Sequence, residues 1–395
     1  MQQSQKVLLI GTMILLKAFH VLLVHESTHS PEEGGQDGGS AGAAPAEKGG
    51  DSDNDSHAYG YNTVLAVILA EGLKLVVSVA IFVRAYLADE GAPPGLLEAG
   101  GARADWAAMT RQRAASYGLP AAIYMVEDNL RFLVLQRLHT PVTWMIFSHL
   151  EIPFVAVMST ALLGRRFSAV QWVSVVLLLN GVMASQLAVC EARMHEPCSS
   201  LSNYPVAGIA MVALSALFAA SAGIASEFIY KRDLSVSIWL QNCLLYAYAM
   251  ALNLGVLALK QAAPGAGPLW AGFSQALPWA VVLSMGGMGL CVSAVIKHMS
   301  NLAKVYTSAL GIFVTAGLSA HYQGFELTLP FLLAAGVVVC ALYLYVLEKG
   351  RADEAAAAPA SPKRTKSTLD VTVTTIAAAA DAAAELVPLN VKHLA

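Results

Sequence analysis

The chain of 395 residues is 56% hydrophobic, only 13% charged, and has a mean hydropathy of +0.57. Soluble domains carry about 25% charged residues, so this composition excludes an ordinary soluble protein. The net charge of −3 argues against a nucleic-acid-binding protein. We therefore expect an all-α membrane protein, and the length allows roughly ten spans of about 20 residues with loops and tails.

The apolar runs of the chain predict ten transmembrane helices. The first run has no small-residue cleavage site after it, so we interpret it as a retained helix rather than a signal peptide. The long run from 279 to 322 is divided at 298–301, which is its most polar point. The predicted helices lie at about 5–24, 62–86, 115–137, 141–164, 168–190, 205–230, 236–259, 276–298, 302–322 and 326–347.

Two segments are too polar or too low in complexity for the membrane. Residues 26–60 are rich in Gly, Ser and acidic residues and predict a flexible loop. The tail, 349–395, is basic and then rich in Ala and Thr, and we expect it to be disordered. The chain thus divides into a first transmembrane helix (1–25), the acidic loop (26–60), the remainder of the ten-helix domain (61–348) and the tail.

Short basic loops predict how the protein lies in the membrane. Arg165-Arg166 and Lys231-Arg232 each connect predicted helices on the side that also holds both termini. Because positively charged loops face the cytosol, both termini are expected in the cytosol, and the acidic loop is expected in the lumen or outside the cell.

The opposite, lumenal side then holds two features that depend on an oxidising, glycosylating compartment. Asn54 begins an Asn-x-Ser sequon in the acidic loop, so it is a candidate glycosylation site. Cys190 and Cys198 flank another loop, where they either form a disulfide or remain free thiols.

A faint internal repeat supports the helix count. Segments 163–168 and 323–328, which are 160 residues apart, each lead from a polar turn into an apolar helix. Ten helices would then form two sets of five, and an odd number of helices per set gives the two sets opposite orientations. Such inverted repeats are typical of transporters, whose substrate site lies near the middle of the membrane between the halves.

The predicted third helix is the most polar of the membrane segments. Asn129 needs no charged partner, and its amide both donates and accepts hydrogen bonds, as recognition of a base or a sugar requires. The charged residues of this helix either pair with Arg131 or line a water-filled cavity, and a charge in the bilayer core is by default a functional candidate. The residues concerned are Tyr124, Glu127, Asp128, Asn129 and Arg131.

Three further predicted helices each carry a pair of ionisable residues. The pairs are Glu71 with Lys74, His149 with Glu151, and Glu227 with Lys231. The first and third of these pairs have the spacing of ion pairs on a helix, so each either locks packing or contributes to a site. The second pair is two residues apart and faces different ways, which disfavours a shared metal ion. No motif of an enzyme, a cofactor site or a metal site is present.

The segment K-H-M-S-N-L-A-K, 297–304, separates two apolar runs. If the segment is helical, Lys297, Asn301 and Lys304 share one face. It is then either an ordinary positive loop that fixes orientation or a cationic surface that meets an anion.

At these motifs the chain resembles the nucleotide-sugar transporter family, in the branch of UDP-galactose, UDP-N-acetylglucosamine and CMP-sialic acid transporters of the drug/metabolite transporter superfamily. The resemblance spans about residues 60–347, with the motifs in the order and spacing of the family. They are A-E-G-L-K (70–74), P-x-x-I-Y with N-L (120–130), Q-W with G-V (171–182), E-x-x-x-K with S-I-W-L-Q-N (227–242) and K-x-x-x-N-L-x-K (297–304).

The resemblance implies ten helices in two inverted halves in the Golgi or endoplasmic reticulum membrane. It also implies exchange of a cytosolic nucleotide sugar for a lumenal nucleoside monophosphate. Asn129 would contact the base, on which Tyr124 and Tyr306 would stack, and Lys297 would lie by the phosphate. The other expected site residues are Asn301, Lys304 and Ser308 at the phosphate end, Arg131, Glu151, Glu227 and Lys231 along the cavity, and Glu71 and Lys74 in its wall.

Three departures from the family pattern leave the substrate open. Glu127-Asp128-Asn129 stands where the family has Q-N-N, Glu151 where it has a lysine, and Phe228 where it has a further lysine. A UDP-sugar is the first expectation, and CMP-sialic acid is the alternative within the family. Two other hypotheses are a diverged carrier for a less anionic solute and a non-transporting scaffold that binds a glycosyltransferase. The protein could form a homodimer under any of these hypotheses.

Overall fold

The computed structural model describes residues 3–29, 61–88, 101–138, 141–194, 206–262, 267–323 and 327–357. These residues form thirteen α-helices and one short 3-10 helix, and no strand occurs among them. Asn54, Cys198 and the tail beyond 357 lie outside the described residues. Cys190 is disulfide-bonded.

The long helices begin and end within a few residues of the predicted segments. The first eight elements are α1 (Gln3–His29), α2 (Thr63–Ala88), α3 (Ala102–Ala108), α4 (Arg111–Ser116), α5 (Gly118–Arg137), α6 (Pro141–Phe147), the 3-10 turn η2 (Ser148–Leu150) and α7 (Glu151–Ala161). The remaining ones are α8 (Ala169–Met194), α9 (Val206–Arg232), α10 (Ile238–Gln261), α11 (Ala276–His298), α12 (Asn301–Gln323) and α13 (Leu329–Ala357). α13 continues past 348, where we expected the tail to begin.

The membrane assignment follows from the composition and surface of these helices. Seven of them, α2 and α8 to α13, are long and apolar enough to cross a bilayer. Large apolar side chains also point outward from them, among them Val76 on α2, Val173 on α8 and Leu333 on α13. An apolar exterior suits contact with lipid, so the prediction of an all-α membrane protein is confirmed. Ten spans remain a prediction, because α5 carries several charges and η2 interrupts the helix of α6 and α7.

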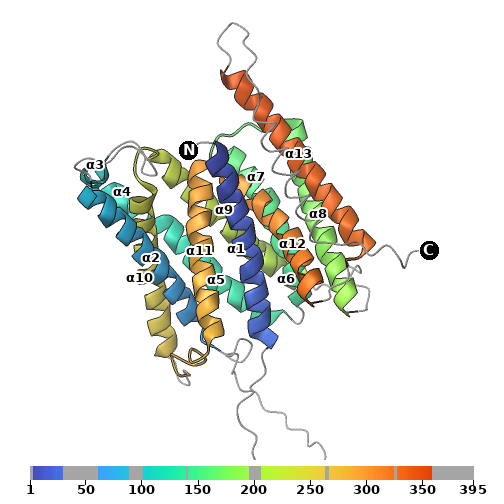
Figure 1. Ribbon diagram of the computed structural model, residues 1–395, viewed down its shortest axis with the longest axis horizontal. Helices are drawn as coiled ribbons and strands as arrows, with labels where there is room; N and C mark the ends of the chain where they lie inside the picture. The colour runs from blue at the N-terminus through green and yellow to red at the C-terminus, as the bar shows by residue number, and fades with distance from the viewer. Residues whose placement is uncertain are drawn as a thin grey trace, which may run out of the picture.

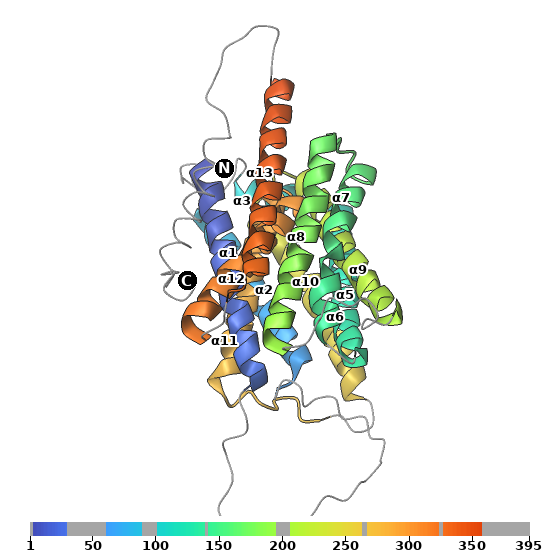
Figure 2. The same cartoon turned by 90° about the vertical axis from the view of Figure 1, so that its right-hand side faces the viewer.

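Most helices run along one common axis, as both overall views show (Figures 1 and 2). α8 packs against α13 at one edge of the bundle, and α2 packs against α10 at the other (Figure 1). α1 lies against both α11 and α12, and α5 lies against α9 and α10. The largest apolar core therefore joins helices far apart in the sequence, with buried residues from α7, α8, α9, α12 and α13.

Gly181 permits the close approach of α8 and α13. A Cβ atom at this position would lie 2.7 Å from Cγ2 of Val338 on α13, which is closer than real Cβ contacts allow. The absence of a side chain lets the two helix backbones come together, as small residues do in membrane helix pairs.

Tyr306 belongs to the same core rather than to a binding site. Its ring stacks on Tyr345 of α13, with centroids 4.5 Å apart, and its hydroxyl forms a 2.9 Å hydrogen bond with the Ser174 hydroxyl. The expectation that Tyr306 stacks on a base is wrong, because its buried ring and hydroxyl already contact Tyr345 and Ser174.

The segment 297–304 is not one continuous helix. α11 ends at His298, Met299 has φ −126° and ψ −92°, and α12 begins at Asn301. The expectation that Lys297 shares a face with Lys304 is therefore wrong. The Lys297 ammonium is buried and donates a 2.5 Å hydrogen bond to the Val236 carbonyl, so it supports the loop between α9 and α10.

We expect Gly181→Ala to destabilise the protein by about 1–3 kcal/mol, because overpacking forces a well-packed interface apart. The matched control is Gly255→Ala on α10, where a Cβ atom meets nothing within 4 Å. Alanine is the better helix former, so the control is expected to keep or raise stability. Thermal unfolding of the two variants in detergent tests this, and an equal response of both would contradict the packing argument.

Candidate functional site

Ionisable residues from four parts of the fold lie near one another in the bundle, most of them half-buried and Arg131 44% exposed, and we call them the central cluster. Two ion pairs organise it: Glu151 with Lys304, at 2.8 Å, and Glu127 with Arg131, at 2.6 Å. The cluster consists of Lys17 and His20 on α1, Tyr124, Glu127, Asp128 and Arg131 on α5, His149 and Glu151 on η2 and α7, and Lys304 and Ser308 on α12.

The interruption between α6 and α7 positions Glu151. The turn η2 ends at Leu150, so Glu151 is the first residue of α7, where the positive end of the helix dipole favours a carboxylate. Lys304 lies one turn into α12 and donates to the Glu151 carboxylate across the interior. The pair therefore connects α7 with α12.

Lys17 reaches the same place from α1. Its ammonium donates a 3.0 Å hydrogen bond to the carbonyl of Ser308, one helical turn beyond Lys304 on α12. The charges of Glu151 and Lys304 both act on it. One turn further along α1, His20 forms a 2.9 Å hydrogen bond with the Ser284 hydroxyl on α11.

The polar residues of α5 are mainly bonded within their own helix. Arg131 donates to one Glu127 oxygen through both Nε, at 3.1 Å, and Nη2, at 2.6 Å. The Asn129 amide donates to the Met125 carbonyl at 2.8 Å, which is one turn back. Tyr124 lies within the fields of Lys304, Glu151 and Glu127. The expected ion pair within the helix, Glu127 with Arg131, is therefore present. It lies on the same helix as Tyr124 and Asn129, which we expected to line a cavity.

Glu71 and Lys74 form the expected pair on α2, with 2.5 Å between nitrogen and oxygen. The Lys74 ammonium also lies 4.6 Å from the ring centroid of Tyr246 on α10, a cation–π contact. The second Glu71 oxygen has no hydrogen-bond partner among the described residues. This pair therefore fastens α2 to α10 and leaves one acceptor unused.

A second group of charges, the Glu227 cluster, lies where α9 ends. The fully buried Glu227 carboxylate contacts Arg165 from the loop after α7 and pairs with Lys231 at 2.7 Å. It also accepts a 2.9 Å hydrogen bond from the backbone N–H of Asn301, at the start of α12. Lys231 in turn donates to the Met299 carbonyl at 2.7 Å. A cavity of about 380 Å³ lies beside this cluster, lined by Leu163, Arg165, Glu227, Phe228, Lys231 and Arg232.

Asn301 packs into the wall between α9 and α12. Its side chain is fully buried, and neither amide atom has a hydrogen-bond partner among the described residues. A Cβ atom on Gly223 would overlap this amide, so glycine is required opposite it.

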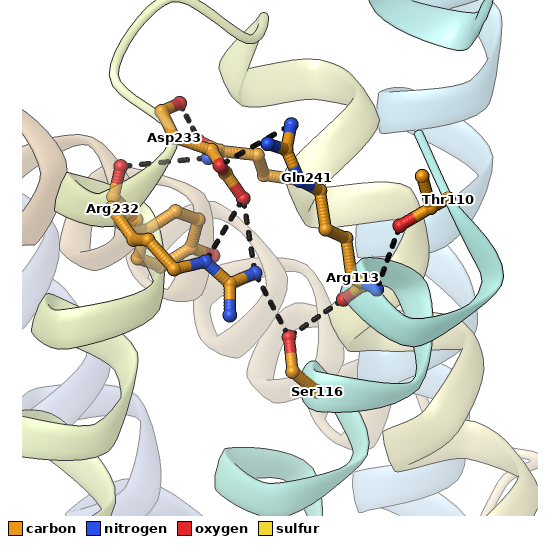
Figure 3. Close-up of polar contacts among 7 residues, drawn as sticks. Thr110, Arg113, Ser116, Arg232, Asp233 and Gln241 are labelled. Carbon is orange, nitrogen blue, oxygen red and sulfur yellow. Dashed lines mark hydrogen bonds and ion pairs between the residues drawn. The ribbon is translucent and has the colours of Figure 1, made fainter. Parts of the chain in front are cut away.

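A third set of contacts lies around Asp233, in the turn between α9 and α10 (Figure 3). Asp233 pairs with Arg232 at 3.0 Å and with Arg113 of α4 at 3.7 Å, and Arg232 also donates to the Ser116 hydroxyl at 3.0 Å. The Gln241 amide donates to the Asp233 carbonyl at 3.0 Å. These contacts hold the segment before α5 against the C-terminal end of α9. From the sequence we interpreted Arg113 and Arg232 only as charges of cytosolic loops.

The structure thus divides the predicted site residues into groups. Tyr124, Arg131, Glu151, Lys304 and Ser308 come together, whereas Glu227, Lys231 and Asn301 form the Glu227 cluster. Lys297 lies apart from both groups. Sequence reasoning missed Lys17 and His20, although a lone lysine within the first apolar run was the available signal. No group of three metal-ligating side chains lies together in the described ranges.

A helical bundle with seven candidate spans and ion pairs in its interior is a multi-pass membrane protein of the kind that carries polar solutes. The model of the family described as nucleotide-sugar transporter matches residues 51–346. The chain therefore belongs to the nucleotide-sugar transporter family, whose members are transporters and not enzymes, as the sequence predicted.

Relatives with two substrate names are similar to this chain. The CMP-sialic acid transporter 1 of Oryza sativa subsp. indica is 33% identical over 234 residues, which are 58% of this chain and 70% of that protein. The UDP-galactose translocators of Mus musculus and Homo sapiens are each 33% identical over 244 residues. These cover 62% of this chain and 61% and 60% of the two proteins.

One solved crystal structure also has a similar fold. It covers 89% of this chain and 100% of its own, with a TM-score of 0.57 and 16% identity. This likeness supports the arrangement of the helices and nothing about the ligand.

We expect Glu227→Gln to destabilise the protein by about 3 kcal/mol, because two cations lose their buried counter-ion. Arg351→Gln is the control, because it breaks an ion pair with Glu348 in which the arginine is 65% exposed, and exposed pairs contribute little to stability. Thermal unfolding in detergent compares the two. A Glu227→Gln protein as stable as the control variant would show that the Glu227 cluster does not hold the helices together.

Proposed function

We propose that the protein exchanges a cytosolic nucleotide sugar for a lumenal nucleoside monophosphate across a Golgi or endoplasmic reticulum membrane. A UDP-sugar such as UDP-galactose or UDP-N-acetylglucosamine is the first candidate, and CMP-sialic acid is the second. The observation that carries the proposal is Lys304, whose ammonium lies inside the bundle against residues of α5 and α7. A cation held there attracts phosphate, and charge-assisted hydrogen bonds then hold it.

This position of Lys304 supports the site that we propose. The phosphate would bind at Lys304 and Ser308, and Tyr124 and Asn129 would face the base and the sugar. Asn129 now donates to its own helix, and it would exchange that bond for one with the ligand. Arg131 and Glu151 border this space, and Glu71 and Lys74 form its wall.

Helix pairing supports two inverted halves of five helices each, when the short α3 and α4 are left out and α6 and α7 are counted as one. The first half runs from α1 to α8 and the second from α9 to α13. α5 packs on α9 as α11 packs on α1, and α5 packs on α10 as α11 packs on α2. α2 and α8 pair with their own counterparts, α10 and α13. Exchange of the two halves therefore leaves the main contacts unchanged, as a two-fold relation requires.

The Glu227 cluster is the proposed closure on the cytosolic side. Arg165 and Lys231 belong to the short basic loops that favour the cytosol. The start of α1 and the end of α13 lie at one end of the bundle in both overall views (Figures 1 and 2). The disulfide at Cys190, at the far end of α8, suits an oxidising lumen. Opening towards the cytosol would then require Glu227 to release α12.

A less anionic solute is the second candidate, and the Lys304–Glu151 pair favours it. Glu151 already neutralises Lys304, and Glu127 and Asp128 add negative charge nearby. Thermal stabilisation by UMP or CMP would support the nucleotide, and the preferred base would define the substrate class. Stabilisation by neither, with stabilisation by a cationic solute, would favour the second candidate.

We expect purified protein in liposomes to exchange labelled nucleotide sugar for trapped UMP or CMP, and Lys304→Ala to lower the exchange rate at least tenfold, because a charged hydrogen bond to phosphate is lost. Lys260→Ala, at the exposed end of α10, is the matched lysine control. Uptake of equal size into liposomes with and without trapped nucleotide would contradict strict exchange, and unchanged exchange by Lys304→Ala would remove Lys304 from the site.

A further inference from the structure

We propose that Lys17 is a second phosphate-binding cation of this site and that it compensates for the acid at position 151. The inference rests on the proposed function, because it concerns the phosphate of the same ligand. Glu151 stands where the resemblance expects a lysine, and Lys17 brings a positive charge to the same place from a different helix.

The position of Lys17 next to Lys304 follows from α12. Ser308, whose carbonyl accepts the Lys17 hydrogen bond, is four residues after Lys304 and so lies on the same face of α12. Gly311 lies on that face as well, and a Cβ atom there would be 3.2 Å from Cδ of Lys17. The glycine leaves room for the lysine stem, so Lys17 contacts α12 one helical turn beyond the position of Lys304.

Two hydrogen bonds fix α1 in this position. Lys17 binds α12 through Ser308, and His20 binds α11 through Ser284. α1 has its main contacts with these two helices. Lys17 is therefore presented inward by a docked helix and does not extend along a lipid-facing surface.

The charge balance distinguishes Lys17 from the other cations of the interior. Lys304, Arg131 and Lys74 each have a carboxylate partner within ion-pair distance. The Lys17 ammonium donates to a neutral carbonyl instead. The charged groups that act on Asp128, the remaining acid, are Arg131, Glu127 and Lys74. Lys17, Lys304 and Glu151 taken alone therefore carry one net positive formal charge, which Lys17 supplies and which Asp128 balances over the whole central cluster.

A phosphate that enters this space meets Lys17 on one side and Lys304 on the other. Lys17 would give up the Ser308 carbonyl and donate to a phosphate oxygen, and the flexible lysine stem allows this change without movement of the backbone. Because α1 and α12 belong to different proposed halves, the ligand would bridge the halves. A neutral nucleoside lacks the group that both lysines bind.

The test measures the affinity of purified full-length protein for UMP, CMP, uridine and cytidine. In Lys17→Met, which keeps the stem but removes the charge, we expect nucleoside monophosphate affinity to fall about ten- to a hundredfold. Nucleoside affinity should not change, and Lys17→Arg should retain most of the monophosphate affinity. Glu151→Gln added to Lys17→Met should recover much of the loss, because it frees Lys304.

Each other outcome has a definite meaning. Equal weakening of nucleosides and monophosphates by Lys17→Met would show a role in packing α1 only and overturn the inference. Unchanged affinities would overturn it as well, and so would a Glu151→Gln substitution that recovers nothing. A wild-type protein that binds none of the four compounds would overturn the proposed function itself, whereas the preceding results leave that function intact.

Discussion

Charges inside a membrane-spanning bundle need partners, and this requirement determines how the helices of this protein fit together. Four buried or half-buried glutamates illustrate it. Glu71 and Glu127 pair with cations on their own helices. Glu151 pairs with Lys304 of α12, and Glu227 pairs with Arg165 from the loop after α7 as well as with Lys231 on its own helix. Pairs within one helix can form in an isolated helix, so they specify no neighbour. The Glu151–Lys304 and Glu227–Arg165 pairs exist only in the assembled bundle, so they specify which helices meet.

Both of the interhelical glutamates depend on a break in a helix. Glu151 begins α7 because the turn η2 interrupts the helix before it. Glu227 receives the first backbone N–H of α12 because the chain turns at Met299. A carboxylate at a helix N-terminus satisfies an otherwise unpaired donor and meets the positive end of the helix dipole. The irregular backbone therefore lies inside the protein, where protein groups satisfy it, as a bilayer demands.

Spacing along one helix was readable from the sequence, and contacts between helices were not. Hydropathy predicts the approximate helix bounds. The Glu71–Lys74 and Glu127–Arg131 pairs follow from the helical repeat, which brings residues three or four apart onto the same face. The partner of Lys297 is a backbone carbonyl in a distant loop, and no side-chain pattern encodes it. In the sequence Lys17 is a single charge in an apolar run, and only the fold shows that α12 supplies its hydrogen-bond acceptor.

The pairing of Lys304 with Glu151 offers a physical reason for the exchange that we propose. Lys304 lies in the second proposed half and Glu151 in the first, so the ion pair ties the halves together when no ligand is bound. Movement of one half against the other without ligand would separate these charges in a medium of low dielectric constant, where separation is costly. In the proposed mechanism a phosphate would replace Glu151 as the partner of Lys304, and Lys17 would offset the charge that the phosphate brings. The ligand would thereby remove the bond that resists reorientation, as a carrier that moves only when loaded requires.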